Sequence, residues 1–118
     1  MTQGIDYFHQ SFALAQKIGA EDSVAYSLYN LAVSYAQAQE WQQALLHALR
    51  SLSICDRLQL PDTQDAIDLI WNLIQATELN VSDIESALGQ IAELDGESVA
   101  ERIAICLTEA DSEVMDAS

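Results

Sequence analysis

The feature that most constrains this chain is the near absence of residues that interrupt a helix. It has one proline and four glycines in 118 residues. Its apolar residues recur at steps of three and four rather than two, which is the spacing of one face of an α-helix. The pattern predicts an all-α fold of about six helices and no strand, with helices that begin near residues 5, 22, 40, 62, 82 and 98.

Several residues predict where these helices begin and end. Gly19 closes the first helix, because glycine adopts the left-handed conformation at little cost. Pro61 ends the third, since proline lacks a backbone donor and forces its predecessor into an extended conformation. Ser82 and Ser98 each precede a glutamate by three residues, a pattern typical of a capping box. Residues 110–118 are small and acidic, and we expect a flexible tail there.

The charge of the chain excludes several classes of partner. With 19 acidic and 4 basic residues, the net charge is −15, which disfavours binding to nucleic acid or to an anionic membrane surface. Half of the residues are hydrophobic, which argues against disorder. Fourteen of the acids fall in residues 61–118 against Arg102 alone, a net charge of −13. We favour a solubilising role for this acidic half, and attraction of a basic partner is the alternative.

The two cysteines carry no redox or metal signature. Cys55 and Cys106 lie in apolar stretches without a recognisable spacing, and we interpret both as small buried hydrophobic residues. No secretory signal opens the chain, and no apolar run approaches the ~20 residues that a membrane-spanning helix requires. We therefore expect a cytoplasmic protein.

An internal repeat is more informative than any single motif. Residues 12–18 parallel residues 52–58 at a spacing of 40, with apolar, small and basic positions in correspondence. Residues 28–31 parallel residues 70–73 at a spacing of 42. A helix pair that recurs at such an interval buries its faces by stacking on the next pair, which predicts a solenoid.

One helix pair resembles the tetratricopeptide repeat, in its longer-period variety. Asn30-Leu-Ala32 followed by Tyr35 is similar to the first helix of that family, and Ala44 would meet Ala32 from the second. The resemblance implies a short right-handed α–α superhelix. It further implies one domain over residues 1–109, with the best repeat at 25–58 and a degenerate repeat or cap at 62–109. The residues expected to pack the repeat are Leu28, Leu31, Ala32, Tyr35, Trp41, Ala44, Ala48 and Ser51.

The chain departs from the family pattern in two places. The turn at residues 38–40 lacks the usual glycine. In the later unit, Ile74 stands where a small residue belongs and Thr77 where an aromatic one belongs. A plain helical bundle is the alternative to the superhelix.

The resemblance also implies a concave surface formed by the first helix of each pair. The residues expected to line it are Tyr26, Tyr29, Val33, Gln37, Asp68, Trp71 and Gln75. Aromatic side chains there would offer a partner a large contact area, although they could instead pack against neighbouring helices. Some members of the family clamp chaperone carboxylates with basic groove residues, which this groove lacks. An apolar or basic peptide or helix suits it better.

No constellation of residues predicts catalysis. His9 and His47 stand in different helices without a catalytic partner at a recognisable spacing, and we expect His47 to be partly exposed. Three aspartates at residues 62, 65 and 68 follow one helical edge, where charge that complements the helix dipole is a better explanation than a cation site. There is no glycine-rich phosphate loop. We predict no catalytic residue, cofactor or metal.

These observations lead to a non-enzymatic adaptor that binds another protein through the concave face of a helical repeat. Two alternatives stay open. The first is a small acidic assembly or secretion-type chaperone that covers a basic or apolar client segment. The second is a fragment of a larger multidomain protein of the same family. Self-association also stays open.

Overall fold

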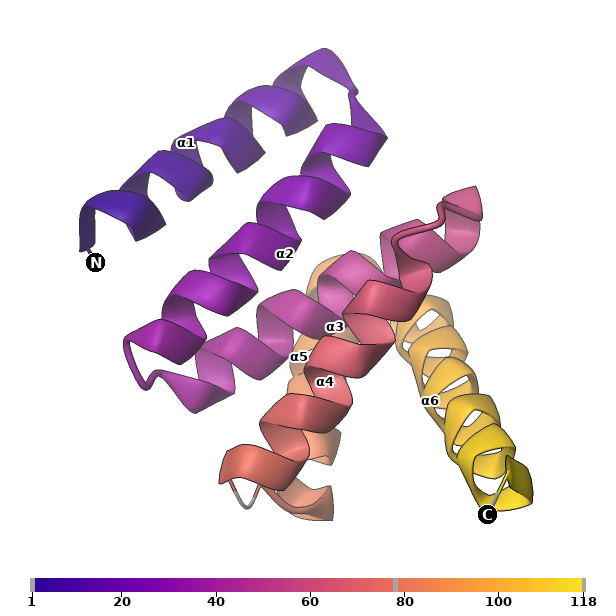
Figure 1. The fold of residues 1–118 in the computed structure, drawn as a ribbon. Helices are drawn as coiled ribbons and strands as arrows, with labels where there is room; N and C mark the ends of the chain where they lie inside the picture. The colour runs from indigo at the N-terminus through magenta and orange to yellow at the C-terminus, as the bar shows by residue number, and fades with distance from the viewer. Residues whose placement is uncertain (1, 78, 118) are drawn as a thin grey trace.

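The computed structural model of the chain describes residues 2–77 and 79–117, and these residues form six helices and no strand. Figure 1 shows the helices following one another in hairpin-like turns, with the two termini on opposite sides of the molecule. The all-α prediction and the number of helices are confirmed. The helices are α1 (Thr2–Ile18), α2 (Glu21–Gln37), α3 (Trp41–Leu58), α4 (Thr63–Thr77), α5 (Val81–Asp95) and α6 (Glu97–Ala117).

Left-handed residues close the first three helices. Gly19 follows α1 with φ of 75°, as its sequence position predicts. Gln39 and Gln59 follow α2 and α3 with φ of 62° and 54°, which is unusual for a residue with a Cβ. After α2, the Glu40 amide donates to the Tyr35 carbonyl at 2.8 Å, so an otherwise unpaired carbonyl gains a partner. A glutamine thus serves the turn in which the family usually has a glycine.

The two predicted capping boxes are wrong in position. The box at α5 is formed by Asn80 and Asp83, each of which accepts a hydrogen bond from the backbone amide of the other, at 3.0 and 2.9 Å. Ser82 lies inside α5. Ser98 lies inside α6, which begins directly after Gly96. Both starts were predicted one to two residues too late.

Helix α3 is the centre of the fold. It packs against α2, α4, α5 and α6, whereas α1 packs on α2. Every residue from Ala44 to Leu49 is buried, so α3 is covered on all sides rather than along one stripe. Buried residues of α5 and α6, including Ile91 and Ile103, join the same core cluster as the leucines of α3. The helices that we expected to form a degenerate repeat or cap therefore complete the core around α3.

Small residues lie at the contact between α2 and α3. Ala32 of α2 and Ala44 of α3 are both fully buried in one cluster. Ala48 and Ser51 continue the buried small positions along α3, and the Ser51 hydroxyl donates to the Ala25 carbonyl of α2 at 2.9 Å. Methyl-sized side chains at such positions allow two helix backbones to approach closely.

The other residues expected to pack the repeat also lie in the interior. Leu28 and Leu31 are buried, and Tyr35 and Trp41 are half-buried against the core. At the opposite end of the chain, α6 continues through Ala117, into the region 110–118 where the sequence favours a tail. The division into a domain at 1–109 and a flexible tail stays a prediction.

Candidate functional site

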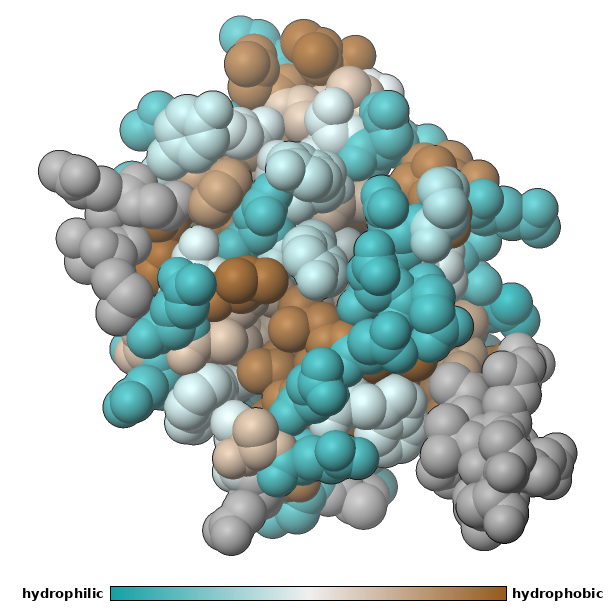
Figure 2. All heavy atoms as spheres, in the orientation of Figure 1, coloured by the Kyte–Doolittle hydropathy of each residue, from teal (hydrophilic) through white to brown (hydrophobic). Residues whose placement is uncertain are grey.

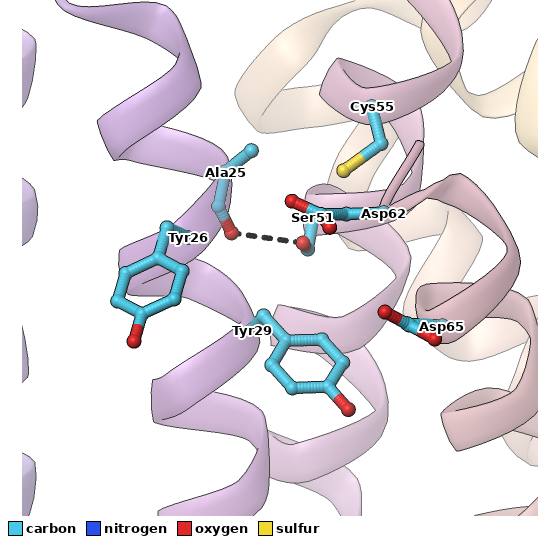
Figure 3. A pocket seen from close by; sticks show the side chains of 7 residues that line it. All are labelled: Ala25, Tyr26, Tyr29, Ser51, Cys55, Asp62 and Asp65. Atoms are coloured by element: carbon cyan, nitrogen blue, oxygen red, sulfur yellow. Dashed lines mark hydrogen bonds between the residues drawn. The ribbon is translucent and has the colours of Figure 1, made fainter. Parts of the chain in front are cut away.

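A cavity of about 100 Å³ opens between α2, α3 and the start of α4. Figure 3 shows how its walls are arranged: Tyr26 and Tyr29 stand on the α2 side, and Asp62 and Asp65 on the α4 side, with α3 between them. The chain direction explains this meeting. Because α2 and α4 both run antiparallel to α3, the first turns of α2 and α4 lie near the last turns of α3. The remaining lining residues are Ala25, Ser51 and Cys55.

The two tyrosines differ in exposure. Tyr26 is 65% exposed, although it belongs to a helix whose neighbouring positions Ala25 and Ser27 are buried. Tyr29 is half-buried one turn further along α2. An aromatic ring that remains largely accessible beside a cavity is the kind of side chain that anchors protein interfaces.

The inner wall of the cavity is small and uncharged. Ser51 is 1% exposed, and its hydroxyl donates to the Ala25 carbonyl. Burial raises the pKa of the Cys55 thiol, and although a hydrogen bond with Ser51 lowers it, Asp62 and Asp65 raise it again. Cys55 is therefore a neutral thiol at physiological pH rather than a reactive thiolate. The charge of the cavity comes from the two carboxylates at its rim.

The remaining residues predicted for the concave surface are not part of this cavity. Gln37, Asp68 and Gln75 are exposed, and Val33 is half-buried. Trp71 is half-buried against the core cluster, and its Nε1 is buried without a hydrogen-bond partner. Trp71 thus packs as the alternative interpretation had it, and only Tyr26 and Tyr29 of the predicted set line the cavity.

The face that carries the cavity combines apolar and acidic features. In Figure 2, seen from the same side as Figure 1, apolar side chains are exposed between α2 and α4, and hydrophilic side chains gather over the first turns of α4. Asp62 and Asp65 are exposed there. Their sequence positions favour a role at the helix dipole, and only the antiparallel order of the helices brings them across from α2.

His47 corrects a further expectation. It is 7% exposed rather than partly exposed, and its Nδ1 donates to the Gln43 carbonyl at 2.7 Å. Its ring centroid lies 5.0 Å from that of Tyr35 and 5.9 Å from that of His9, and His9 Nε2 shares a hydrogen bond of 2.8 Å with the Tyr35 hydroxyl. Burial lowers the pKa of His47, the hydrogen bond to Gln43 raises it in part, and the nearby His9 and Arg50 lower it. These side chains join α1, α2 and α3.

With this geometry established, comparison with known families identifies the first three helices. Residues 1–57 match the family model of the tetratricopeptide repeat. Over these residues the chain is similar to tetratricopeptide-repeat proteins. The match covers α1, α2 and nearly all of α3, and thus includes the helix pair α2 and α3, whose sequence resembles the repeat. Comparison with curated proteins and with solved structures gives no match.

The tetratricopeptide repeat supplies two of the three walls of the cavity, from α2 and α3, and α4 supplies the third. Such repeats are protein–protein interaction modules. In the part of the chain that the structure describes, none of the helices combines the length and the apolar character needed to cross a membrane.

Proposed function

We propose that the chain is a non-enzymatic adaptor that binds a segment of a partner protein along the face between α2 and α4. The observation that carries the proposal is Tyr26, a tyrosine that stays 65% exposed within the repeat, directly beside a cavity. Burial of such a side chain at an interface supplies large contact area with little loss of rotamer freedom. The family match over residues 1–57 supports an interaction module.

The partner segment would lie along α2 and follow the groove residues predicted from the sequence. Val33 and Gln37 continue from Tyr29 along α2, and Asp68 and Gln75 provide polar positions on α4. A cytoplasmic setting suits this role and stays a prediction.

A matched pair of tyrosines tests the proposal. A photo-crosslinking phenylalanine derivative at position 26 should capture the partner, and the same residue at position 7 should not, since Tyr7 is equally exposed at 64% but lies on α1. The captured protein is then purified and its affinity measured. Tyr26→Ala with Tyr29→Ala should weaken binding about tenfold or more, as expected of interface anchors.

The control is Tyr7→Ala, which should bind as the wild type does. Circular dichroism confirms that all variants keep their helices. If the double variant binds with unchanged affinity and Tyr7→Ala binds more weakly, the groove assignment is wrong and the partner binds on the α1 side.

A small acidic chaperone is the second candidate, because residues 61–118 carry fourteen acids against one base. It predicts that affinity for the captured partner falls steeply as salt rises, since exposed charges are screened over about 8–10 Å at 0.10–0.15 M salt. Affinity that is insensitive to salt would argue against the chaperone.

A further inference from the structure

The cavity between α2, α3 and α4 is about as large as the terminal atoms of one long side chain. Its volume of about 100 Å³ corresponds to the space of roughly three water molecules. It is too small for a helix or a folded loop, but it admits the terminal atoms of one long side chain. A partner segment lying in the groove would therefore insert a single residue here.

The walls of the cavity match a positive charge. Tyr26 and Tyr29 line one side, and the face of an aromatic ring attracts a cation within about 6 Å. Two carboxylates, Asp62 and Asp65, stand on the other side, as Figure 3 shows. None of the seven lining residues is basic.

The cations of this chain do not neutralise those carboxylates. Among the described residues, the ion pairs join Arg50 to Asp95, Arg57 to Glu21 and Arg102 to Asp56. None of these pairs includes Asp62 or Asp65. The cavity thus keeps its negative charge for a group brought by another molecule.

Other occupants fit less well. An anion would be repelled by both carboxylates, and an apolar group would remove water from them without offering a hydrogen bond in return. A hard metal ion usually needs more oxygen ligands than two aspartates supply, and the described residues contain no group of three that could hold a metal.

We propose that this cavity binds the end of one lysine or arginine side chain of the partner, between the rings of Tyr26 and Tyr29 and the carboxylates of Asp62 and Asp65. The inference rests on the proposed function, because it names the residue that anchors the partner segment in the groove. The exposed Tyr26 ring covers the aliphatic stem of the inserted side chain, and the carboxylates receive its charged end.

Amide chemical shifts of the labelled full chain test the proposal without a known partner. The probes are the N-acetyl methylamides of lysine, arginine and norleucine, and norleucine keeps the apolar stem but lacks the charge. Lysine or arginine or both should give saturable shifts at residues 25–29, 51–55 and 62–65, and which of them binds identifies the anchor. Equal shifts with norleucine, or no saturable shift with any probe, overturn the proposal.

Variants that remove the charge without changing the shape provide the second arm. Asp62→Asn with Asp65→Asn should raise the Kd for the cationic probe about tenfold. Glu93→Gln with Glu101→Gln removes the same two charges from exposed positions on α5 and α6, outside the cavity, and should change the Kd less than about twofold. An equal effect of both variants would show attraction by the overall field rather than by this cavity, and would overturn the proposal.

The outcome separates this inference from the function on which it rests. If the captured partner still depends on Tyr26 and Tyr29 but binds Asp62→Asn with Asp65→Asn unchanged, the cation site is wrong and the groove assignment stands. If the cationic probes bind in the cavity but the partner binds Tyr26→Ala with Tyr29→Ala at unchanged affinity, the groove assignment is wrong and the cation site stands.

Discussion

Replacing Ala44 by leucine should force α2 and α3 apart. Ala44 is 0% exposed and shares a core cluster with Ala32, which is also 0% exposed. Leucine adds three carbon atoms, and burying them in existing space would be worth about 0.8 kcal/mol each. Because both alanines are fully buried, we expect no such space, and the helices or their neighbours would have to move.

Overpacking of this kind costs about 1–3 kcal/mol, and we expect about 2 kcal/mol for Ala44→Leu. For a chain of this length, each kcal/mol lowers Tm by about 4 °C. The variant should therefore unfold about 8 °C below the wild type, and its urea midpoint should fall at an unchanged m-value. Circular dichroism at the helix minimum follows both transitions.

Ala13→Leu is the matched control, because Ala13 is exposed in the interior of α1. The same added atoms meet solvent there, and the free energy of unfolding should change by less than about 0.5 kcal/mol. If Ala44→Leu is as stable as Ala13→Leu, the contact between α2 and α3 has spare room. Our account of small residues as the determinant of helix spacing would then be refuted.

Three further predictions follow from single contacts. Asn80→Ala removes the cap of α5 and should cost about 1 kcal/mol, whereas Ser82→Ala should be close to neutral; equal costs in urea unfolding would contradict the observed cap. Burial keeps the pKa of His47 below its ordinary 6.5. As the pH falls through 6.5, the unfolded state therefore takes up a proton before the folded state does, and the free energy of unfolding decreases. His47→Gln should lose less unfolding free energy than the wild type between pH 7.5 and pH 5.5. An equal loss in the two proteins would contradict this prediction. Ile70→Ala opens a cavity in the core and should lower the free energy of unfolding by about 2–5 kcal/mol. Leu94→Ala, at a position 61% exposed, should be close to neutral. Similar thermal midpoints for both variants would refute the placement of Ile70 in the core.

The helices themselves could be predicted because their signals are local. The three-and-four spacing of apolar residues, Gly19 and Pro61 fixed the number of helices and most of their ends. The burial of Ala32 and Ala44 could be predicted from the family resemblance, since small residues recur there at matching positions.

Other features depend on information that a local pattern lacks. Asn80–Asp83 and Ser82–Glu85 both satisfy the spacing of a capping box, and the choice between them depends on where the preceding helix ends. Gln39 gives no glycine signal, yet it adopts a positive φ in the turn between α2 and α3. Leu46 and Leu49 are buried because four other helices surround α3. The spacing of apolar residues within α3 alone does not predict this.

The candidate site was predicted on one side only. Tyr26 and Tyr29 were found from the repeat, because the family places its groove on that helix. Asp62 and Asp65 were missed as their partners, since they lie more than thirty residues away in sequence and meet the tyrosines only through the return of the chain after Pro61. Trp71, which the register predicts for the groove, packs partly against the core, and its place in the groove stays a prediction.

Hydrogen exchange of the chain with and without its captured partner tests the central claim most directly. If the partner lies between α2 and α4, backbone amides near residues 25–33 and 62–75 should exchange more slowly in the complex, and those of α1 should be unaffected. Slower exchange confined to α1, or to α5 and α6, would place the partner on another face and contradict the account.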